Sequence, residues 1–392
     1  MKSTGVVARG ITTPIIRQGD NLVELICDSL IESSKRDGYV LEDGDIVGVT
    51  EAVVGIAQGN YATLDQIAKD VRSKFGGGPL GIVFPILSRN RFANLLLGIS
   101  KGCDKLYIQF SYPRDEVGNS FVELSKCDEK GVNPYTDNFT EEQFRDVFGM
   151  ETIHKFTGID YIDYYKEIAG DCEIVFSNDP TYLLNYTKNI LCCDIHTRQR
   201  TKSLLEKAGA EKCFCLDDIL TESVDGSGYS EYGLLGSNKA TADSVKLFPK
   251  DTDVFVKELQ DELLNRTGSK LEVMVYGDGC FKDPAGGIWE LADPVVSPAF
   301  TEGLAGTPNE IKIKYVADND YADLSGNALA ETIKERIKNK QKDLVGDMSS
   351  EGTTPRRIHD LVGSLCDLVA GSGDRGTPVV LVKNYFKNYA SD

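Results

Sequence analysis

Three consecutive residues, Gly277, Asp278 and Gly279, directly follow an apolar run from Leu271 to Tyr276. The run has the length and composition of a buried strand, so chain polarity places Asp278 just past the strand's carboxyl end. Ligands bind at that edge in open α/β sheets. A carboxylate between glycines suits a metal ion or a metal-bound phosphate, although Asp and Gly are also ordinary turn residues. Asp278 is therefore a candidate metal ligand that needs support from the rest of the chain.

A helix and a turn precede this strand and must position it. Asp253 can cap the helix, and Gly268 can end it. The apolar residues between them fall on one stripe, as expected for a helix that packs on a sheet: Val256, Leu259, Leu263 and Leu264.

The composition is that of a globular protein, with 41% apolar and 27% charged residues. At 392 residues the chain is long enough for two domains, or for one domain with a large insertion. Its net charge of −18 argues against nucleic acid and against an anionic membrane as partners. No apolar run reaches transmembrane length, and the amino-terminal residues lack the apolar centre of a signal peptide. We therefore expect a cytoplasmic protein.

The cysteines and histidines do not predict a metal centre. Ten cysteines are scattered without a repeated C-x-x-C pattern, and the close pairs at 192–193 and 213–215 have poor geometry for zinc. Reduced, buried thiols are the expected state. The three histidines form no H-x-x-H or H-E-x-x-H pair, which disfavours a histidine-based site.

Secondary-structure signals alternate along the first hundred residues. The patterns predict strands and helices in turn: a strand within 6–16, a helix at 21–33, a strand at 44–56, a helix at 64–75, a strand at 80–86 and a helix that Ser88 could cap. After residue 229 the same architecture resumes. There the patterns predict a strand at 311–317, helices at 328–340 and 357–370, and a final strand at 379–383.

The middle of the chain is different in composition, with more aromatic and acidic residues. It contains an amphipathic helix at 139–148, opened by Thr140, and a strand–helix–strand unit whose helix runs over 197–208. It has neither G-x-G-x-x-G nor a P-loop lysine. We predict a mixed α/β (α+β) fold, with a core formed by 1–108 and 229–392 and an inserted α/β subdomain at 109–228.

The stretch that contains Asp278 resembles the coenzyme F-420 gamma-glutamyl ligase family. In that family an "RTG" turn and a strand lead into a "SDTFGRP" loop, and here the loop reads YGDGCFKDP. Asp278 falls on the loop aspartate, and Lys282 stands where an arginine is usual.

Three further blocks resemble the same family. The opening LEDGDIVGVTEAVVGIAQG is similar to a "DGD" turn followed by "VTSKIVSKAEG". The segment YGLLGSNKATADSVKLFPKD resembles "AGVDESNVPPGTVLLLP", with Ser237 and Asn238 on its "SN". The closing RRIHDLVGSLCDLVAGSGDRGTPVVLVKN resembles the family's last helix and strand, with Asp360 on the aspartate of its "ADE". The middle of the chain has no recognised counterpart.

The resemblance implies a ligase that uses GTP, or ATP, and Mg²⁺ or Mn²⁺ to activate a carboxylate and join L-glutamate to it. It also implies a gamma-glutamyl-ligase-like core that assembles as a homodimer and acts on a small-molecule substrate. Asp278 and Asp360 would hold the metal, and Ser237, Asn238 and Lys282 would bind nucleotide or substrate. An exposed Asp at a closing helix and a turn at Ser237–Asn238 are the simpler readings. No catalytic residue is assigned.

Several charged positions of the family are replaced in this chain. The two lysines of "TSKIVSKAEG" fall on Ala52 and Ile56, which cannot contact phosphate as a cation. Glu51 lies next to a replaced position, and Arg89 and Arg91 at a helix start could attract an anion instead, though each could be an ordinary surface charge.

Three functions follow as hypotheses. The first is the ligase. The second is an altered scaffold that binds a nucleotide or an anionic metabolite without turnover, which the lost lysines favour. The third, a structural or assembly partner, lacks the long exposed apolar stripe that it would need.

Overall fold

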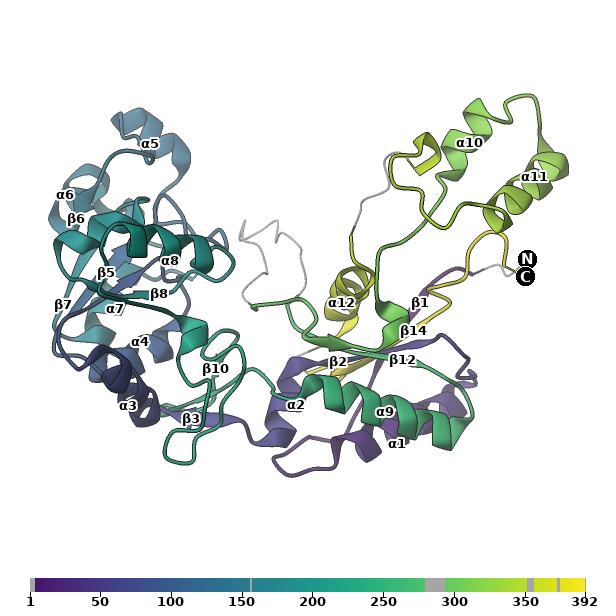
Figure 1. Cartoon of the computed structure of the whole chain (residues 1–392), viewed down its shortest axis with the longest axis horizontal. Coiled ribbons are helices and arrows are strands. Elements are labelled where there is room, and N and C mark those ends of the chain that lie inside the picture. Colours follow the sequence, from purple (N-terminus) through teal and green to yellow (C-terminus); the bar gives the residue numbers. More distant parts are fainter. Residues whose placement is uncertain (1–3, 156, 279–292, 351–355, 372–373, 392) are drawn as a thin grey trace.

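The structure, a computed structural model, describes residues 4–155, 157–278, 293–350, 356–371 and 374–391. These residues form two lobes, each built on its own β-sheet (Figure 1). Both ends of the chain contribute to the first lobe, and the middle of the chain forms the second. The mixed α/β fold class is therefore confirmed.

The first lobe has a five-stranded sheet in the order β1-β14-β2-β12-β13. The strands are β1 (Val7–Ile11), β14 (Val379–Lys383), β2 (Ile46–Thr50), β12 (Glu272–Tyr276) and β13 (Ala299–Phe300). Helices α1 (Leu22–Asp37) and α9 (Thr252–Thr267) cover one face, and α12 (Ile358–Val369) covers the other (Figure 1). Both faces are buried, which explains why the central strands read as continuous apolar runs.

Strands β2 and β12 are parallel neighbours, with Thr50 opposite Tyr276. Both therefore end at the same edge of the sheet. The chain continues from β2 directly into α2 (Glu51–Gln58) and from β12 into Gly277 and Asp278.

The second lobe has a six-stranded sheet in the order β6-β7-β5-β4-β8-β9, parallel except for the pairing of β6 with β7. Its strands are β4 (Leu80–Val83), β5 (Leu106–Phe110), β6 (Phe139–Thr140), β7 (Cys172–Phe176), β8 (Asn189–Cys192) and β9 (Lys212–Cys215). Its helices are α3 (Leu64–Phe75), α4 (Phe92–Lys101), α5 (Leu124–Lys130), α6 (Glu141–Phe148), α7 (Tyr161–Ala169) and α8 (Arg198–Lys207). Because β4 and β5 belong to this sheet, it begins earlier in the chain than the expected insertion at 109.

A small three-stranded sheet lies where the chain passes between the lobes (Figure 1). Its strands are β3 (Tyr61–Thr63), β11 (Ser244–Lys246) and β10 (Asn238–Lys239). Strand β3 leads into the second lobe and β11 leads back out, and the two are paired antiparallel. On the far side of the first lobe, α10 (Ile313–Asn319) and α11 (Gly326–Lys338) project from the sheet (Figure 1). Among the described residues, no helix combines the length and the hydropathy that a membrane span requires.

Local sequence signals set several element ends, and the end of α9 at Gly268 is the predicted one. Asn21 caps α1, and Thr63 and Gln66 form a capping box at the start of α3. Gly268 ends α9 with a left-handed backbone, φ 74°. These residues supply the side-chain acceptor or the positive φ that a helix end requires.

Three local predictions were wrong. The apolar segment 44–56 is a strand only as far as Thr50 and then a helix, because a short apolar run does not by itself separate the two. Residues 313–319 form helix α10 rather than a strand. Asp251, not Asp253, occupies the cap position of α9, and Asp253 lies in its first turn.

The contact between α12 and the first sheet requires a glycine in β2. A Cβ on Gly48 would lie 2.5 Å from Cys366 Sγ and 3.3 Å from Tyr276 Cδ1. We expect Gly48→Ala to lower the free energy of unfolding by about 1–3 kcal/mol because α12 must move away from the sheet. Chemical denaturation followed by circular dichroism measures this. Gly78→Ala, where a Cβ meets nothing within 4 Å, is the matched control and should stay near the wild type.

Candidate active site

The carboxyl edge of the first sheet carries two acidic residues that the parallel strands bring together. Glu51 follows β2 and Asp278 follows β12, and their strands are hydrogen-bonded neighbours. The sequence-based placement of Asp278 just past a strand end is therefore confirmed. The position is the one at which open sheets bind ligands.

Asp278 belongs to a triad with Asp293 and Arg91. The Arg91 guanidinium contacts both carboxylates, with Nη2 2.6 Å from Asp278 Oδ2 and Nη1 2.6 Å from Asp293 Oδ1. The Asp278 backbone N–H also donates to Asp293 Oδ2 at 2.8 Å. Two carboxylates therefore converge on one cation.

The Asp293 side chain is only 2% exposed, so its charge depends on these partners. A buried carboxylate without a partner is strongly unfavourable. Gly277 makes room for it, because a Cβ at that position would lie 2.3 Å from Asp293 Oδ2. Position 277 therefore requires a glycine, because any side chain there would collide with the Asp293 carboxylate.

Arg91 comes from the other lobe, at the start of α4. The Ser88 Oγ accepts the Arg91 backbone N–H at 3.1 Å in the turn before α4, but Arg91, and not Ser88 as had been expected, occupies the cap position of the helix. Burial by itself lowers the pKa of the Arg91 guanidinium, but the carboxylates of Asp293 and Asp278 outweigh it and hold the pKa above its usual value. The Arg91 side chain is therefore always positively charged.

A second ion pair, Glu51 with Lys246, lies beside the triad. Lys246 Nζ is 2.7 Å from Glu51 Oε2, and both side chains are less than one-tenth exposed. Burial raises the pKa of Glu51, Lys246 opposes that rise, and Asp293 adds to it. Glu51 and Arg91 also influence each other's pKa, so the two ion-paired groups are electrostatically one cluster. Its three carboxylates and two cations leave one negative charge.

The segment that contains Ser237 and Asn238 borders the cluster. The Lys239 backbone N–H donates to the Asn90 carbonyl at 2.7 Å, next to Arg91. Gly236 lies against Pro294, since a Cβ there would be 2.9 Å from the Pro294 Cδ. Ser237 is buried, and its Oγ donates to the Leu234 carbonyl at 2.7 Å, so it stabilises a turn. Asn238 begins strand β10 and is half-buried.

The two remaining predicted site residues are Asp360 and Lys282. Asp360 is in the first turn of α12, with its Oδ1 3.6 Å from His359 Nε2. The His359 ring stacks on Phe300, whose strand partner is Met274. Lys282 lies outside the described residues.

The positions aligned with the family's lysines also differ from expectation. The predicted strand at 44–56 would carry both Ala52 and Ile56, but they lie about one turn apart on helix α2. They follow Glu51 and precede the exposed Gln58, whose side chain binds the Lys250 backbone.

A small cavity lies behind Arg91. Its volume of about 20 Å³ admits about one water molecule. Apart from Arg91 and Ser237, the lining is mainly apolar: Ile86, Phe92, Leu95, Cys193, Ile195, Leu216, Leu234, Leu235 and Gly236. The apolar side chains of this lining remove one side of the arginine from bulk solvent, which strengthens its ion pairs.

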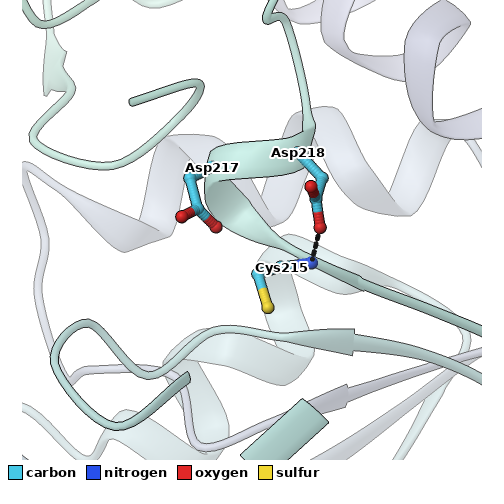
Figure 2. A group of neighbouring side chains, drawn as sticks. All are labelled: Cys215, Asp217 and Asp218. Carbon is cyan, nitrogen blue, oxygen red and sulfur yellow. Dashed lines mark hydrogen bonds between the residues drawn. The ribbon is translucent and has the colours of Figure 1, made fainter. Parts of the chain in front are cut away.

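A separate group of possible metal ligands, Cys215, Asp217 and Asp218, lies in the second lobe (Figure 2). Figure 2 shows the hydrogen bond from the Cys215 N–H to Asp218, which closes a short 3₁₀ turn. Arg198 pairs with Asp217 at 2.6 Å and Lys202 with Asp218 at 3.1 Å. These contacts are those of a turn with neutralised carboxylates, so we assign no metal here.

Sequence reasoning missed Asp293 and Lys246. Asp293 precedes a proline and reads as a turn residue, and Lys246 is a single charge in a short strand. Neither carries a local signal of its role. Glu51 and Arg91 were considered only as replacements for the lost lysines, and the structure places both in the cluster.

Comparison with known proteins agrees with the resemblance. The model of the family described as F420-0:Gamma-glutamyl ligase matches residues 10–384. The match includes both lobes and encloses the segment 109–228. No curated protein matches the chain.

Removal of Lys246 tests whether the buried Glu51 carboxylate depends on this cation for stability. We expect Lys246→Met to lower the free energy of unfolding by about 3–5 kcal/mol near neutral pH, because Glu51 stays buried without its cation. Urea unfolding of the single and double variants measures it. Glu51→Gln combined with Lys246→Met should regain most of the loss.

The loss should also depend on pH. Without Lys246, burial raises the folded-state pKa of Glu51 further above that of the unfolded chain, so folding takes up a proton. The contribution is then fully favourable below the unfolded pKa and lost as the pH rises through the folded one. The Lys246→Met deficit should therefore shrink as the pH is lowered from 8 to 5. A deficit independent of pH would contradict this account.

Proposed function

The chain belongs to the F420-0:Gamma-glutamyl ligase family, and from that premise we propose that it is a nucleotide- and metal-dependent ligase. It joins an amino acid, L-glutamate, to a carboxylate of a small molecule and consumes GTP or ATP. The observation that carries the proposal is the convergence of Asp278, Asp293 and Arg91, with Glu51 and Lys246 beside them, at the carboxyl edge of the first sheet.

The donor set suits a hard divalent cation. Asp278 and Asp293 offer carboxylate oxygens, which Mg²⁺ and Mn²⁺ prefer. The two carboxylates already lie within reach of one cation, since Arg91 contacts both at 2.6 Å. When bound, the metal would neutralise charge on the phosphate oxygens during transfer.

The proposed reaction has two steps, which follow from the family. An oxygen of the acceptor carboxylate attacks the γ-phosphorus, the bond from that phosphorus to the nucleotide breaks, and an acyl phosphate and a nucleoside diphosphate form. The amine of glutamate then attacks the acyl carbon, phosphate leaves and the amine loses a proton. Both steps place negative charge at the site, where Arg91 and the amino-terminal end of α4 would attract it.

The remaining predicted residues have unequal support. Ser237 and Asn238 border the cluster, which is consistent with a role in binding nucleotide or substrate. Lys282 and Asp360 remain proposed on the resemblance alone, as a substrate-binding residue and a metal ligand.

A second candidate function is binding without turnover. Ala52 and Ile56 stand where the family has two lysines, and α2 therefore presents no cation at these positions. In that case the protein would bind a nucleotide or an anionic metabolite and release no phosphate.

Nucleotide binding is tested first by thermal shift, with GTP, GDP, ATP and ADP, each with Mg²⁺ or Mn²⁺, and with metal alone. A nucleotide at a hundredfold excess over its dissociation constant stabilises the folded state by about 2.7 kcal/mol. We expect metal-dependent stabilisation by one nucleoside triphosphate. No shift with any nucleotide would contradict the ligase proposal.

Turnover separates the ligase from the binding protein. Phosphate release should require a carboxylate acceptor and glutamate together, and Asp278→Asn should lower its rate about 100-fold or more. Asp253→Asn, an exposed aspartate at the start of α9, is the matched control and should leave the rate unchanged. Stabilisation by a nucleotide without phosphate release under any pairing would favour the binding protein. Unchanged turnover in Asp278→Asn would show that the site is wrong.

We also propose that the protein is a homodimer, as the resemblance implies. Large apolar side chains near the end of the chain are exposed in one subunit, among them Val345, Met348 and Leu368. Burial of such residues against a second copy would remove them from water. Light scattering should give a particle of twice the chain mass, and a single-chain mass at micromolar concentration would contradict the proposal.

A further inference from the structure

Arg91 takes the place at the site that a divalent cation would need. Its guanidinium contacts Asp278 Oδ2 and Asp293 Oδ1, each at 2.6 Å, and its side chain is only 17% exposed. A metal ion held by the same two carboxylates requires oxygen atoms at about 2.0–2.2 Å from its centre. The guanidinium occupies Asp278 Oδ2 and Asp293 Oδ1, and the Asp278 N–H occupies Asp293 Oδ2, so three of the four carboxylate oxygens already have a partner where a metal would bind.

The charges of the cluster also favour one occupant at a time. With Arg91 in place, the three carboxylates and two cations leave one negative charge. A divalent ion added to that arrangement would make the cluster net positive in a largely buried site, whereas replacement of the guanidinium by the ion changes the net charge by only one unit. Like charges close together in such surroundings repel strongly.

Displacement of Arg91 requires its side chain to move away from the two carboxylates. Arg91 lies directly before α4, its backbone N–H donates to Ser88 Oγ, and a cavity large enough for about one water molecule adjoins its side chain. Asp278 and Asp293 belong to the other lobe, so departure of Arg91 removes two ion pairs that join the lobes.

We propose that Arg91 is an internal cation that holds the Asp278–Asp293 pair when no metal is bound, and that a divalent metal must displace it. This inference rests on the proposed metal site. Its consequence is that metal affinity is lower than two converging carboxylates would otherwise give, and that metal binding weakens the contact between the lobes.

The test is Mn²⁺ binding to the full-length protein, measured by electron paramagnetic resonance of free Mn²⁺ without nucleotide. Arg91→Gln removes the competing cation and should bind Mn²⁺ at least about tenfold more tightly than wild type. Arg91→Lys keeps a cation that can pair with one carboxylate and should fall between the two. Arg89→Gln, an exposed arginine at the same helix start, is the matched control and should change affinity less than twofold.

Thermal melting keeps the test decisive if a variant is unstable. Metal-free Arg91→Gln should melt below wild type, because two partly buried carboxylates lose their cation, and Mn²⁺ should raise its melting temperature by more than it raises that of wild type. Equal or weaker Mn²⁺ binding in Arg91→Gln, or an equal rise in melting temperature, would overturn the inference.

Two aspartate variants distinguish this failure from failure of the proposed function. If Asp278→Asn and Asp293→Asn abolish Mn²⁺ binding but Arg91→Gln does not strengthen it, the metal site stands and the competition is wrong. If neither aspartate variant changes Mn²⁺ binding, in the wild-type or the Arg91→Gln background, the proposed metal site itself is wrong.

Discussion

The burial of one carboxylate, that of Asp293, sets the arrangement of the whole site. A charge that is 2% exposed needs a cation close by, and the cation is Arg91, which belongs to the other lobe. The lobes must therefore meet at this point. Gly277 has no side chain because the Asp293 carboxylate fills that space, and the Asp278 N–H binds the same carboxylate. Packing, lobe arrangement and the position of the candidate metal ligand thus follow from one ion pair.

The neighbouring Glu51–Lys246 pair is a second buried ion pair at the same edge of the sheet, and it too joins distant parts of the chain. Lys246 comes from β11 in the small sheet that connects the lobes, and Glu51 comes from the helix that follows β2. Each ion pair therefore joins segments distant in sequence. Buried pairs of this kind contribute little net stability, but each fixes the position of its partners. A site that must hold phosphate oxygens and a metal needs that fixed geometry.

Local features of this structure could be predicted from the sequence, whereas contacts between distant residues could not. The apolar run at 271–276, followed by glycine, was enough to place Asp278 at a strand end, because chain polarity is a local property. Asp293 and Lys246 have no local signal, since their partners lie 202 and 195 residues away. The segment 44–56 was misread because continuous apolar residues suit a buried strand and a short helix equally. The predicted boundary at 109 falls inside the second lobe, because the strand predicted at 80–86 reads like the strands of the first sheet and no composition change precedes it.

The small sheet between the lobes has an evolutionary consequence. The chain leaves the first lobe through β3 and returns through β11, and these two strands are hydrogen-bonded to each other. The second lobe is therefore connected to the first through the paired strands β3 and β11, in the way that a long loop is connected to the two strands of a hairpin. Insertions or deletions beyond the paired strands leave the spacing of β3 and β11 unchanged, so the first sheet can keep its geometry while the second lobe changes. Because Arg91 belongs to the second lobe and contacts Asp278 and Asp293, a change in the position of that lobe would alter the surroundings of these two carboxylates.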